Sequence, residues 1–277
     1  MFKMGRNIAR SIHRAITHED SVDVSEIDGV RSLHLGSDTV QSSMRVKAPY
    51  DLELKYTRGM MVFLLFNKQV RNLAMIGLGG GSVPKYIYQY LPQIACKVIE
   101  INPRIIQVAR SHFFVPHDEY LPSGEPRFEV IQADGAVYVA EHADSMQVLV
   151  IDAFDSRGIP QDLCTQSFFD DCFEALTLDG MLVVNLWGSD RNFDVYLQRI
   201  EQSFQQRVLV MPTGRPGNII VFAFKRAPQD LRWSTLRERA RALEAEYKIE
   251  FMDFIERLRD HNPNTPNRLL LERESAE

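Results

Sequence analysis

Strand-like and helix-like segments alternate along the middle of the chain, and this alternation constrains the fold more than any other feature. We predict strands over residues 72–76, 95–100, 127–131, 147–152 and 180–186, and helices over residues 82–91, 103–112, 135–141, 166–176 and 190–203. Strands separated by helices pair in parallel, because each helix carries the chain back to the starting edge of the sheet. The sequence therefore predicts an α/β domain with a doubly wound sheet.

The last two apolar segments of this domain are joined differently. Residues 206–212 and 218–224 are connected by the stretch Pro-Thr-Gly-Arg-Pro-Gly at residues 212–217. A connection of this kind predicts a β-hairpin, so one strand must run antiparallel to the others. A mostly parallel, Rossmann-like sheet that ends in a hairpin is typical of class I AdoMet-dependent transferases, whereas a dinucleotide-binding domain continues with parallel units.

A glycine-rich turn follows the first strand of the domain. The segment LAMIGLGGGS at residues 73–82 runs from an apolar strand through Gly77, Gly79 and Gly81 into a helix. Glycine has no Cβ, so its backbone can approach a ligand closely, and the helix N-terminus that follows offers unpaired N–H groups. We therefore predict that the turn binds a nucleotide or nucleoside. Ser82 stands where a dinucleotide fingerprint has its last glycine, which disfavours NAD.

Acidic residues follow at the ends of the next two strands. Glu100 lies about twenty residues beyond the glycines, where a carboxylate can accept hydrogen bonds from both ribose hydroxyls. Asp134 precedes Gly135 after the third strand, and an aspartate there can accept from an adenine amino group. Asp134 can equally cap the helix that begins at Gly135. We predict that these residues help to bind the nucleoside.

Two carboxylates follow the fourth strand. In VIDAFDSRGIP, Asp152 and Asp155 stand outside the carboxyl end of a parallel strand, which is where open α/β sheets bind ligands. Such a pair can hold a cationic amine and take its proton, because a nitrogen needs a free lone pair to act as a nucleophile. Asp155 can instead cap the Asp-Ser-Arg-Gly turn. We predict that the pair belongs to a catalytic site.

Composition and charge disfavour several other classes of function. The chain has 32 Lys and Arg against 37 Asp and Glu, so nothing in its net charge of -5 favours nucleic acid as a partner. The longest apolar run, residues 60–66, is far shorter than the roughly 20 residues that span a bilayer, and no secretory signal precedes it. The three cysteines lack C-x-x-C spacing, and the histidines lack metal-ligand spacing. We expect a cytoplasmic protein without membrane, nucleic acid or metal.

The patterns divide the chain into three parts. Residues 1–66 form a small N-terminal region, with an amphipathic helix expected over 1–18, short antiparallel strands over 20–48 and a helix over 51–66. Residues 67–228 form the AdoMet-type nucleoside-binding catalytic domain. Residues 229–277 form a C-terminal helix, expected over 229–259 and packed by one face, and a polar tail.

The ordered motifs GLGGGS, VIEIN, ADGA, VIDAFDSRGIP and LDGMLVVNLW resemble those of the spermidine synthase (polyamine aminopropyltransferase) family over about residues 25–225. The resemblance implies that the glycine turn, Glu100 and the Asp-Gly pair bind the donor, and that Asp152 and Asp155 supply the base and hold the amine. In YDLELKYTRGMM, Tyr56 matches a tyrosine that orients the acceptor. In TVQSSM, Gln41 matches a glutamine near the donor.

The resemblance implies an enzyme that moves an aminopropyl group from decarboxylated AdoMet to a small amine or polyamine, and it suggests a homodimer. Gly80 stands where the family has an aspartate that engages the amino group of the donor's arm. An N-methyltransferase that uses AdoMet on an amine or protein is therefore the alternative. A non-catalytic AdoMet-binding module is a second alternative, and the Asp152–Asp155 pair argues against it.

Overall fold

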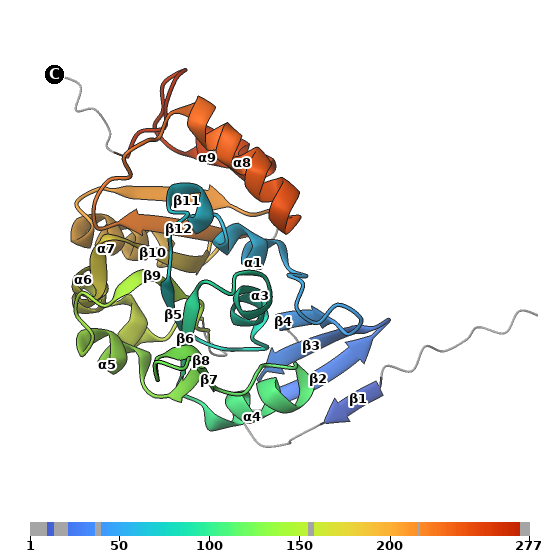
Figure 1. Ribbon diagram of the computed structural model, residues 1–277. Helices are drawn as coiled ribbons and strands as arrows, with labels where there is room; N and C mark the ends of the chain where they lie inside the picture. The colour runs from blue at the N-terminus through green and yellow to red at the C-terminus, as the bar shows by residue number, and fades with distance from the viewer. Residues whose placement is uncertain (1–9, 14–21, 37–39, 155–157, 215–216, 272–277) are drawn as a thin grey trace, which may run out of the picture.

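The computed structural model describes residues 10–13, 22–36, 40–154, 158–214 and 217–271 (Figure 1). Within these residues the strands form two sheets. The small sheet is antiparallel and consists of β1 (Arg10–His13), β2 (Val22–Ile27), β3 (Val30–Leu35) and β4 (Val40–Arg45). The large sheet consists of β5 (Asn72–Ile76), β6 (Ala95–Glu100), β7 (Glu119–Tyr120), β8 (Pro126–Gln132), β9 (Met146–Ile151), β10 (Leu176–Trp187), β11 (Val208–Pro212) and β12 (Asn218–Phe224).

The large sheet has the spatial order β11-β12-β10-β9-β5-β6-β8-β7. Strands β10, β9, β5, β6 and β8 run parallel, and β12 is inserted antiparallel between β10 and β11. The parallel core and the terminal hairpin are thus confirmed. Sequence reasoning missed β7, a two-residue strand that pairs antiparallel with the edge strand β8.

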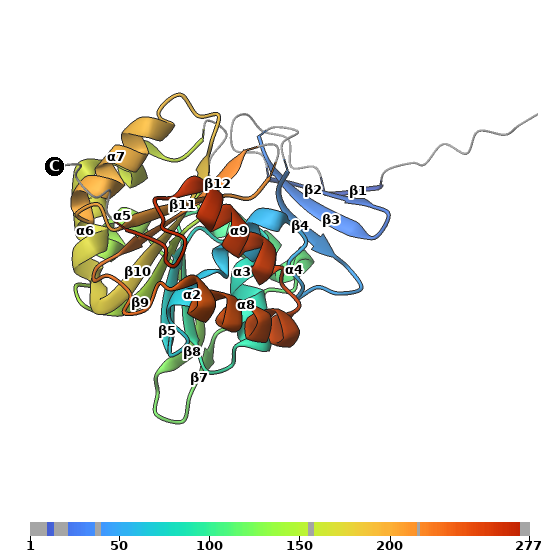
Figure 2. The same cartoon turned by 90° about the horizontal axis from the view of Figure 1, so that it is seen from above.

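Helices cover both faces of this sheet, as Figure 2 shows from above. They are α1 (Lys55–Met60), α2 (Phe63–Phe66), α3 (Ser82–Tyr90), α4 (Pro103–His112), α5 (Gly135–Ala140), α6 (Gln166–Ala175), α7 (Phe193–Ser203), α8 (Trp233–Tyr247) and α9 (Phe251–His261), with a 3-10 turn η1 (Gln161–Cys164). Side chains from α5, α6 and α7 share one core with the sheet, and side chains from the other α-helices share the second.

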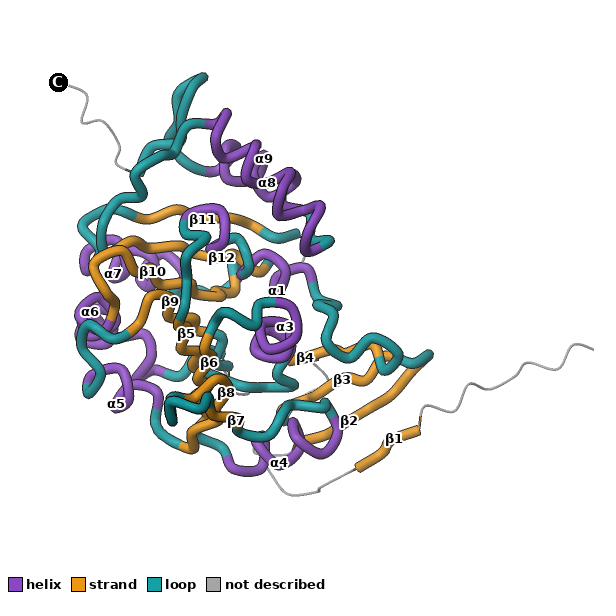
Figure 3. Tube along the Cα trace, in the orientation of Figure 1, coloured by secondary structure: helices purple, strands orange, loops and turns teal. Residues whose placement is uncertain are grey.

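Alternate residues of each central strand enter opposite cores. Val148 and Val150 of β9 pack with the α3 and α8 side, whereas Leu149 and Ile151 pack with the α5 and α6 side. Both faces are therefore buried, which explains why these strands are continuous apolar runs instead of alternating ones. The tube in Figure 3 shows the strands enclosed between the helices.

Three predictions about helices are wrong in part. Residues 10–13 form β1, because pairing with β2 satisfies their backbone hydrogen bonds, and the rest of the expected helix over 1–18 lies outside the described residues. The helix expected over 51–66 is divided into α1 and α2. The helix expected over 229–259 ends at Tyr247 because Lys248 adopts a left-handed conformation at φ +59°, and α9 begins after Glu250.

The C-terminal region holds α1 and α2 in place. The guanidinium of Arg58 in α1 forms an ion pair with Glu250 at 2.9 Å, and Arg239 in α8 donates to the backbone oxygen of Leu65 at 3.0 Å. Trp233 is buried in the same core as Met60. These contacts fix α1 against β10 and β12, near the end of β10 and the start of β12. Across the described part of the chain, every helix is too short or too polar to cross a membrane.

Candidate active site

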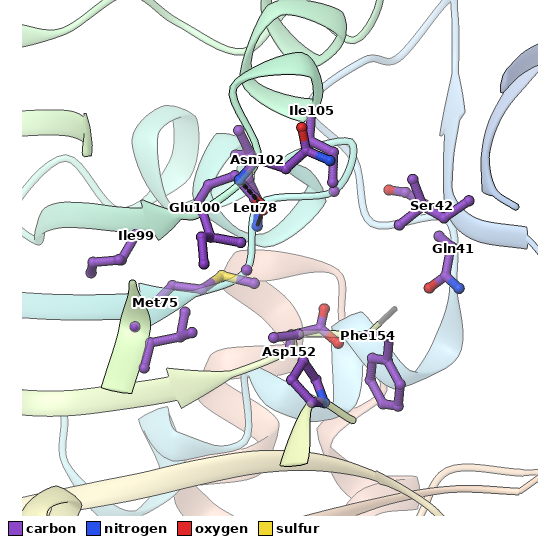
Figure 4. Close-up of a pocket in the computed structure, with 18 of the residues that line it drawn as sticks. Gln41, Ser42, Met75, Leu78, Ile99, Glu100, Asn102, Ile105, Asp152 and Phe154 are labelled. Atoms are coloured by element: carbon purple, nitrogen blue, oxygen red, sulfur yellow. Dashed lines mark hydrogen bonds between the residues drawn. The ribbon is translucent and has the colours of Figure 1, made fainter. Parts of the chain in front are cut away.

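A cavity of about 410 Å³ opens at the carboxyl ends of the central parallel strands. The turns after β5, β6, β8 and β9 form its floor, and β4 and α1 close it from the side. It is lined by Val22, Leu35, Gln41, Ser42, Tyr56, Thr57, Met75, Ile76, Gly77, Leu78, Gly79, Ser82, Val83, Ile99, Glu100, Ile101, Asn102, Ile105, Asp134, Gly135, Asp152, Ala153, Phe154, Pro160, Asp162 and Leu163. Figure 4 shows Asp152 and Glu100 on one side of this space and Gln41 and Ser42 on the other.

The glycine turn after β5 needs its glycines for two reasons. Gly77, Gly79 and Gly81 have φ values of +93°, +51° and +67°, which side chains rarely adopt. A Cβ on Gly77 would also collide with the backbone oxygen of Asp152. Gly77 and Gly79 line the cavity, whereas Gly81 caps α3 and faces Val115 behind the turn. Gly81 therefore shapes the turn from outside the cavity lining.

Gly80 faces the small sheet. A Cβ at this position would lie 2.6 Å from Ser42 Oγ and 2.9 Å from a ring carbon of Phe113. Ser42 Oγ also lies 3.1 Å from Ser82 Oγ, so β4 contacts the start of α3 as well. An aspartate could not replace Gly80 without movement of Ser42 and Phe113.

Glu100 at the end of β6 is buried and binds backbone. One carboxylate oxygen accepts from the backbone N–H of Leu78 at 3.0 Å, and the other accepts from that of Asn102 at 2.8 Å. Burial raises the pKa of Glu100, and these backbone donors oppose the rise. A carboxylate has about four acceptor sites, so these bonds leave capacity for a ligand. Figure 4 draws the bond to Leu78 beside the cavity.

Asp134 and Gly135 lie at the start of α5. The Asp134 carboxylate caps this helix by accepting from the backbone N–H of Ala136 at 2.8 Å, and it lines the cavity as well. Both interpretations of this residue therefore fit its position. A Cβ on Gly135 would lie 2.5 Å from a methyl carbon of Ile76, so glycine lets α5 approach β5.

Asp152 and Tyr56 both line the cavity. Asp152 follows β9 and accepts a hydrogen bond from Asn185 Nδ2 at 2.8 Å. Burial raises the pKa of Asp152 to about 6, although the Asn185 donor opposes the rise. Burial and the charge of Asp152 together raise the pKa of Tyr56 well above its usual value. Asp155, the other predicted carboxylate, lies outside the described residues.

Gln41 belongs to β4 and lines the same cavity. Its backbone oxygen accepts a hydrogen bond from the Tyr56 hydroxyl at 3.2 Å, so the small sheet and α1 are joined directly at the cavity wall. Figure 4 shows the Gln41 side chain near Phe154. The structure thus brings together at the cavity every predicted site residue that it describes except Gly81.

Sequence reasoning missed Ser42, Phe154 and Asn185 as contributors to the site. The signal for Asn185 was present, because it is a polar residue inside the apolar strand LVVNLW and is only 2 % exposed. No local pattern distinguishes Ser42, since its place over the glycine turn depends on how the small sheet docks.

The charged side chains that line the cavity, among the described residues, are all acidic. Among the described residues that line it, Glu100, Asp134, Asp152 and Asp162 are acidic and none is Lys, Arg or His. Arg58, two residues after Tyr56, binds Glu250 and the backbone oxygens of Leu52 and Glu53. The described part of the chain gathers no group of three or more His, Cys, Asp or Glu side chains that could hold a metal ion. The lining therefore favours a cationic ligand.

The glycine turn, the acid after the second parallel strand and the antiparallel strand next to β10 define a class I AdoMet-dependent transferase fold. Within that class, the model of the spermine/spermidine synthase domain matches residues 53–228, and the chain belongs to this family. It is 39 % identical over 262 residues to a polyamine aminopropyltransferase of Chromobacterium violaceum, covering 95 % of this chain and 98 % of the relative. A polyamine aminopropyltransferase of Neisseria meningitidis serogroup A is 38 % identical, covering 94 % and 97 %.

Solved structures show the same fold. A spermidine synthase in complex with the transition-state analogue AdoDATO has a TM-score of 0.66 at 20 % identity and covers 89 % of this chain and 85 % of its own. Human methyltransferase-like protein 13 in complex with SAH has a TM-score of 0.61 at 24 % identity and covers 70 % and 93 %. Both likenesses confirm the transferase fold class.

Proposed function

We propose that this protein transfers the aminopropyl group of decarboxylated AdoMet to a small amine acceptor of the polyamine type. The observation that carries the proposal is the acidic lining of the cavity, in which the described residues supply four carboxylates and no cationic side chain. Decarboxylated AdoMet and an amine are both cations. The full-length similarity to polyamine aminopropyltransferases supports the same reaction.

The lining also favours the decarboxylated donor over AdoMet. AdoMet carries an α-carboxylate, which binds well where an Arg, a Lys or a cluster of backbone donors meets it. In this cavity the carboxylate would approach Asp152 instead, and like charges repel. Gly80 does not alter this balance, because its missing side chain would point toward Ser42 and Phe113.

The remaining acceptor sites of Glu100 suit the two hydroxyls of a ribose, and its backbone bonds hold the carboxylate in place. The glycine turn allows the nucleoside to approach the backbone closely. Asp134 also lines the cavity, where it is available to the adenine amino group. Gln41 closes the donor region from β4.

Asp152 acts as the general base. The acceptor nitrogen attacks the carbon next to the sulfonium, the carbon–sulfur bond breaks, and its electron pair stays on sulfur as a neutral thioether. The proton lost by the nitrogen passes to the Asp152 carboxylate. The Tyr56 hydroxyl, kept protonated by its raised pKa, orients the amine with Asp152. Asp155 is a further candidate for holding the amine.

The test is calorimetric binding of decarboxylated AdoMet and AdoMet, followed by product analysis with a set of diamines. We expect the decarboxylated donor to bind at least about tenfold more tightly, the effect of about 1.4 kcal/mol. Turnover should release methylthioadenosine and an amine extended by an aminopropyl group. Tighter AdoMet binding with a methylated amine would establish the methyltransferase alternative. Tight binding of either donor without turnover on any amine would establish a binding module.

A further inference from the structure

Three side chains on neighbouring strands of the large sheet form a series of hydrogen-bonded amide and carboxylate groups that ends at Asp152. Asn218 Nδ2 at the start of β12 donates to Asn185 Oδ1 at 3.0 Å, and Asn185 Nδ2 in β10 donates to Asp152 Oδ1 at 2.8 Å. Asn218 reaches this edge because β12 runs antiparallel, which brings its first residue beside the last residue of β10, Trp187. A sixth parallel strand would have placed its first residue at the opposite edge.

The direction of the hydrogen bonds in this series is set by the carboxylate of Asp152 at its end. An ionised carboxylate only accepts hydrogen bonds, so Asn185 must present its Nδ2 to Asp152 and turn its Oδ1 away. The Oδ1 is buried with the rest of Asn185 and needs a donor, which Asn218 supplies. Asn218 therefore supports the orientation of the Asn185 amide that presents its N–H to the base.

We propose that Asn185 and Asn218 are positioning residues, which hold Asp152 ionised and reserve its Oδ2 for the proton of the acceptor. This inference rests on the proposed function, in which Asp152 is the base. Asn185 occupies Oδ1, so the proton that leaves the acceptor nitrogen forms its new bond at Oδ2. Once protonated, Asp152 could turn the Asn185 amide over by donating to its Oδ1. Asn218 opposes that turn, because the reversed amide would set the Asn185 Nδ2 against the Asn218 Nδ2, and neither nitrogen can accept a hydrogen bond.

Other groups around Asp152 do not supply this function. Among the described residues, the titratable side chain that faces Asp152 from a neighbouring element is Tyr56 on α1. Its hydroxyl donates to the backbone oxygen of Gln41. The neighbouring strand β5 presents Ile76, whose backbone oxygen accepts from the Asp152 N–H at 3.0 Å. In the described part of the chain, Asn185 is thus the side chain that donates a hydrogen bond to the Asp152 carboxylate.

The test follows the Asp152 carboxyl directly, by nuclear magnetic resonance titration of the full chain labelled in its aspartate carboxyl carbons. The Asp152 resonance is assigned by its loss in Asp152→Asn. Asn218→Asp replaces the orienting donor by an acceptor and reverses the Asn185 amide, and Asn218→Ala leaves that amide free to turn. We expect the midpoint of the Asp152 titration to rise by about one pH unit in Asn218→Asp and by less in Asn218→Ala.

The control is Ser189→Asp, which adds the same charge at an exposed position in the loop after β10. It should leave the titration and the activity as in the parent. In the enzyme assay, the acidic limb of kcat/KM should move with the titration, so kcat/KM should fall about tenfold at pH 5 in Asn218→Asp and stay near the parental value above pH 8. A purely structural role would lower activity equally at all pH values and leave the titration midpoint unchanged.

Asn185→Leu removes the donor itself and should shift the titration as far as Asn218→Asp does. If Asn185→Leu does not fold, the Asn218 variants at the half-buried edge decide the question. A titration midpoint that is the same in parent, Asn218→Ala and Asn218→Asp overturns the proposal. If the parent transfers no aminopropyl group to any amine, the proposed function fails, yet the carboxyl titration still tests the positioning of Asp152.

Discussion

The backbone oxygen of Asp152 fills the space that a side chain on Gly77 would require. The glycine begins the turn after β5, and Asp152 follows the adjacent parallel strand β9. The binding turn and the candidate base are therefore packed directly against each other. A side chain at residue 77 therefore requires either the turn or the Asp152 backbone to move.

We expect Gly77→Ala to destabilise the protein more than the same substitution at Gly124. Both glycines have similar φ values, +93° and +86°, so both substitutions carry the left-handed penalty of about 1–2 kcal/mol. Nothing lies within 4 Å of a Cβ on Gly124, whereas Gly77 meets the Asp152 backbone, and overpacking adds about 1–3 kcal/mol. Urea unfolding of the two variants measures the difference. Equal losses would mean that the contact with Asp152 is easily relieved.

Asp152→Asn should lower turnover by about 10²–10⁴-fold and change the affinity for the donor by only a few fold, because the base acts on the acceptor. Steady-state kinetics and calorimetry separate the two effects. In the parent, kcat/KM should decline below about pH 6, where the Asp152 carboxyl is protonated and cannot take a proton. A variant with parental turnover would remove Asp152 from the mechanism.

The same substitution should stabilise the protein at neutral pH. The pKa of Asp152 is raised on folding to about 6, so between pH 4 and 6 the folded state binds a proton that the unfolded state has lost. Stability from this group therefore falls as the pH rises through that range, and it stays low at pH 7. We expect Asp152→Asn to melt at a higher temperature than the parent at pH 7 and to lose this advantage at pH 4. A lower melting temperature at both pH values would contradict the assignment.

Glu100→Gln should weaken donor binding by about 1.5–3 kcal/mol, the range for a hydrogen bond to a charged group, with little effect on turnover at saturation. The amide nitrogen that replaces one oxygen cannot accept from Leu78 or Asn102, so the turn beside the ribose loosens too. Glu141→Gln, at an exposed position after α5, is the matched control and should bind the donor normally. Parental affinity in Glu100→Gln would place the ribose elsewhere.

Lys85 gives a prediction about stability and pH. This side chain in α3 is 1 % exposed, donates to the backbone oxygen of Phe113 at 2.7 Å and contacts Met44. Burial lowers the pKa of Lys85 to about 7, while an unfolded lysine titrates near 10.4. Above pH 7 the unfolded state therefore binds the extra proton, and stability rises with pH.

Between pH 7 and 8.5 this rise should be about 1–2 kcal/mol in the parent and absent in Lys85→Met. Urea unfolding at the two pH values in both proteins measures it, and the comparison cancels groups that they share. The same pH dependence in both proteins would show that Lys85 is charged in the folded state.

Much of this protein follows from local sequence. The order of strands and helices, the terminal hairpin and the turn at Gly77 and Gly79 depend on apolar periodicity and on glycines, which act over a few residues. Glu100, Asp134 and Asp152 were predicted at the site because parallel strands bring their carboxyl ends to one edge. That rule requires only the number and direction of the strands.

Only the tertiary structure determined which residues meet through the direction of the strands and the docking of the small sheet. Asn218 reaches the site because β12 is inserted antiparallel beside β10, and no pattern around residue 218 contains that pairing. Gly80 turns toward Ser42 and Phe113 because the small sheet docks on the glycine turn, so its position in the motif did not reveal which way a side chain would point. Such contacts join residues far apart in the chain, and only the packed fold determines their geometry.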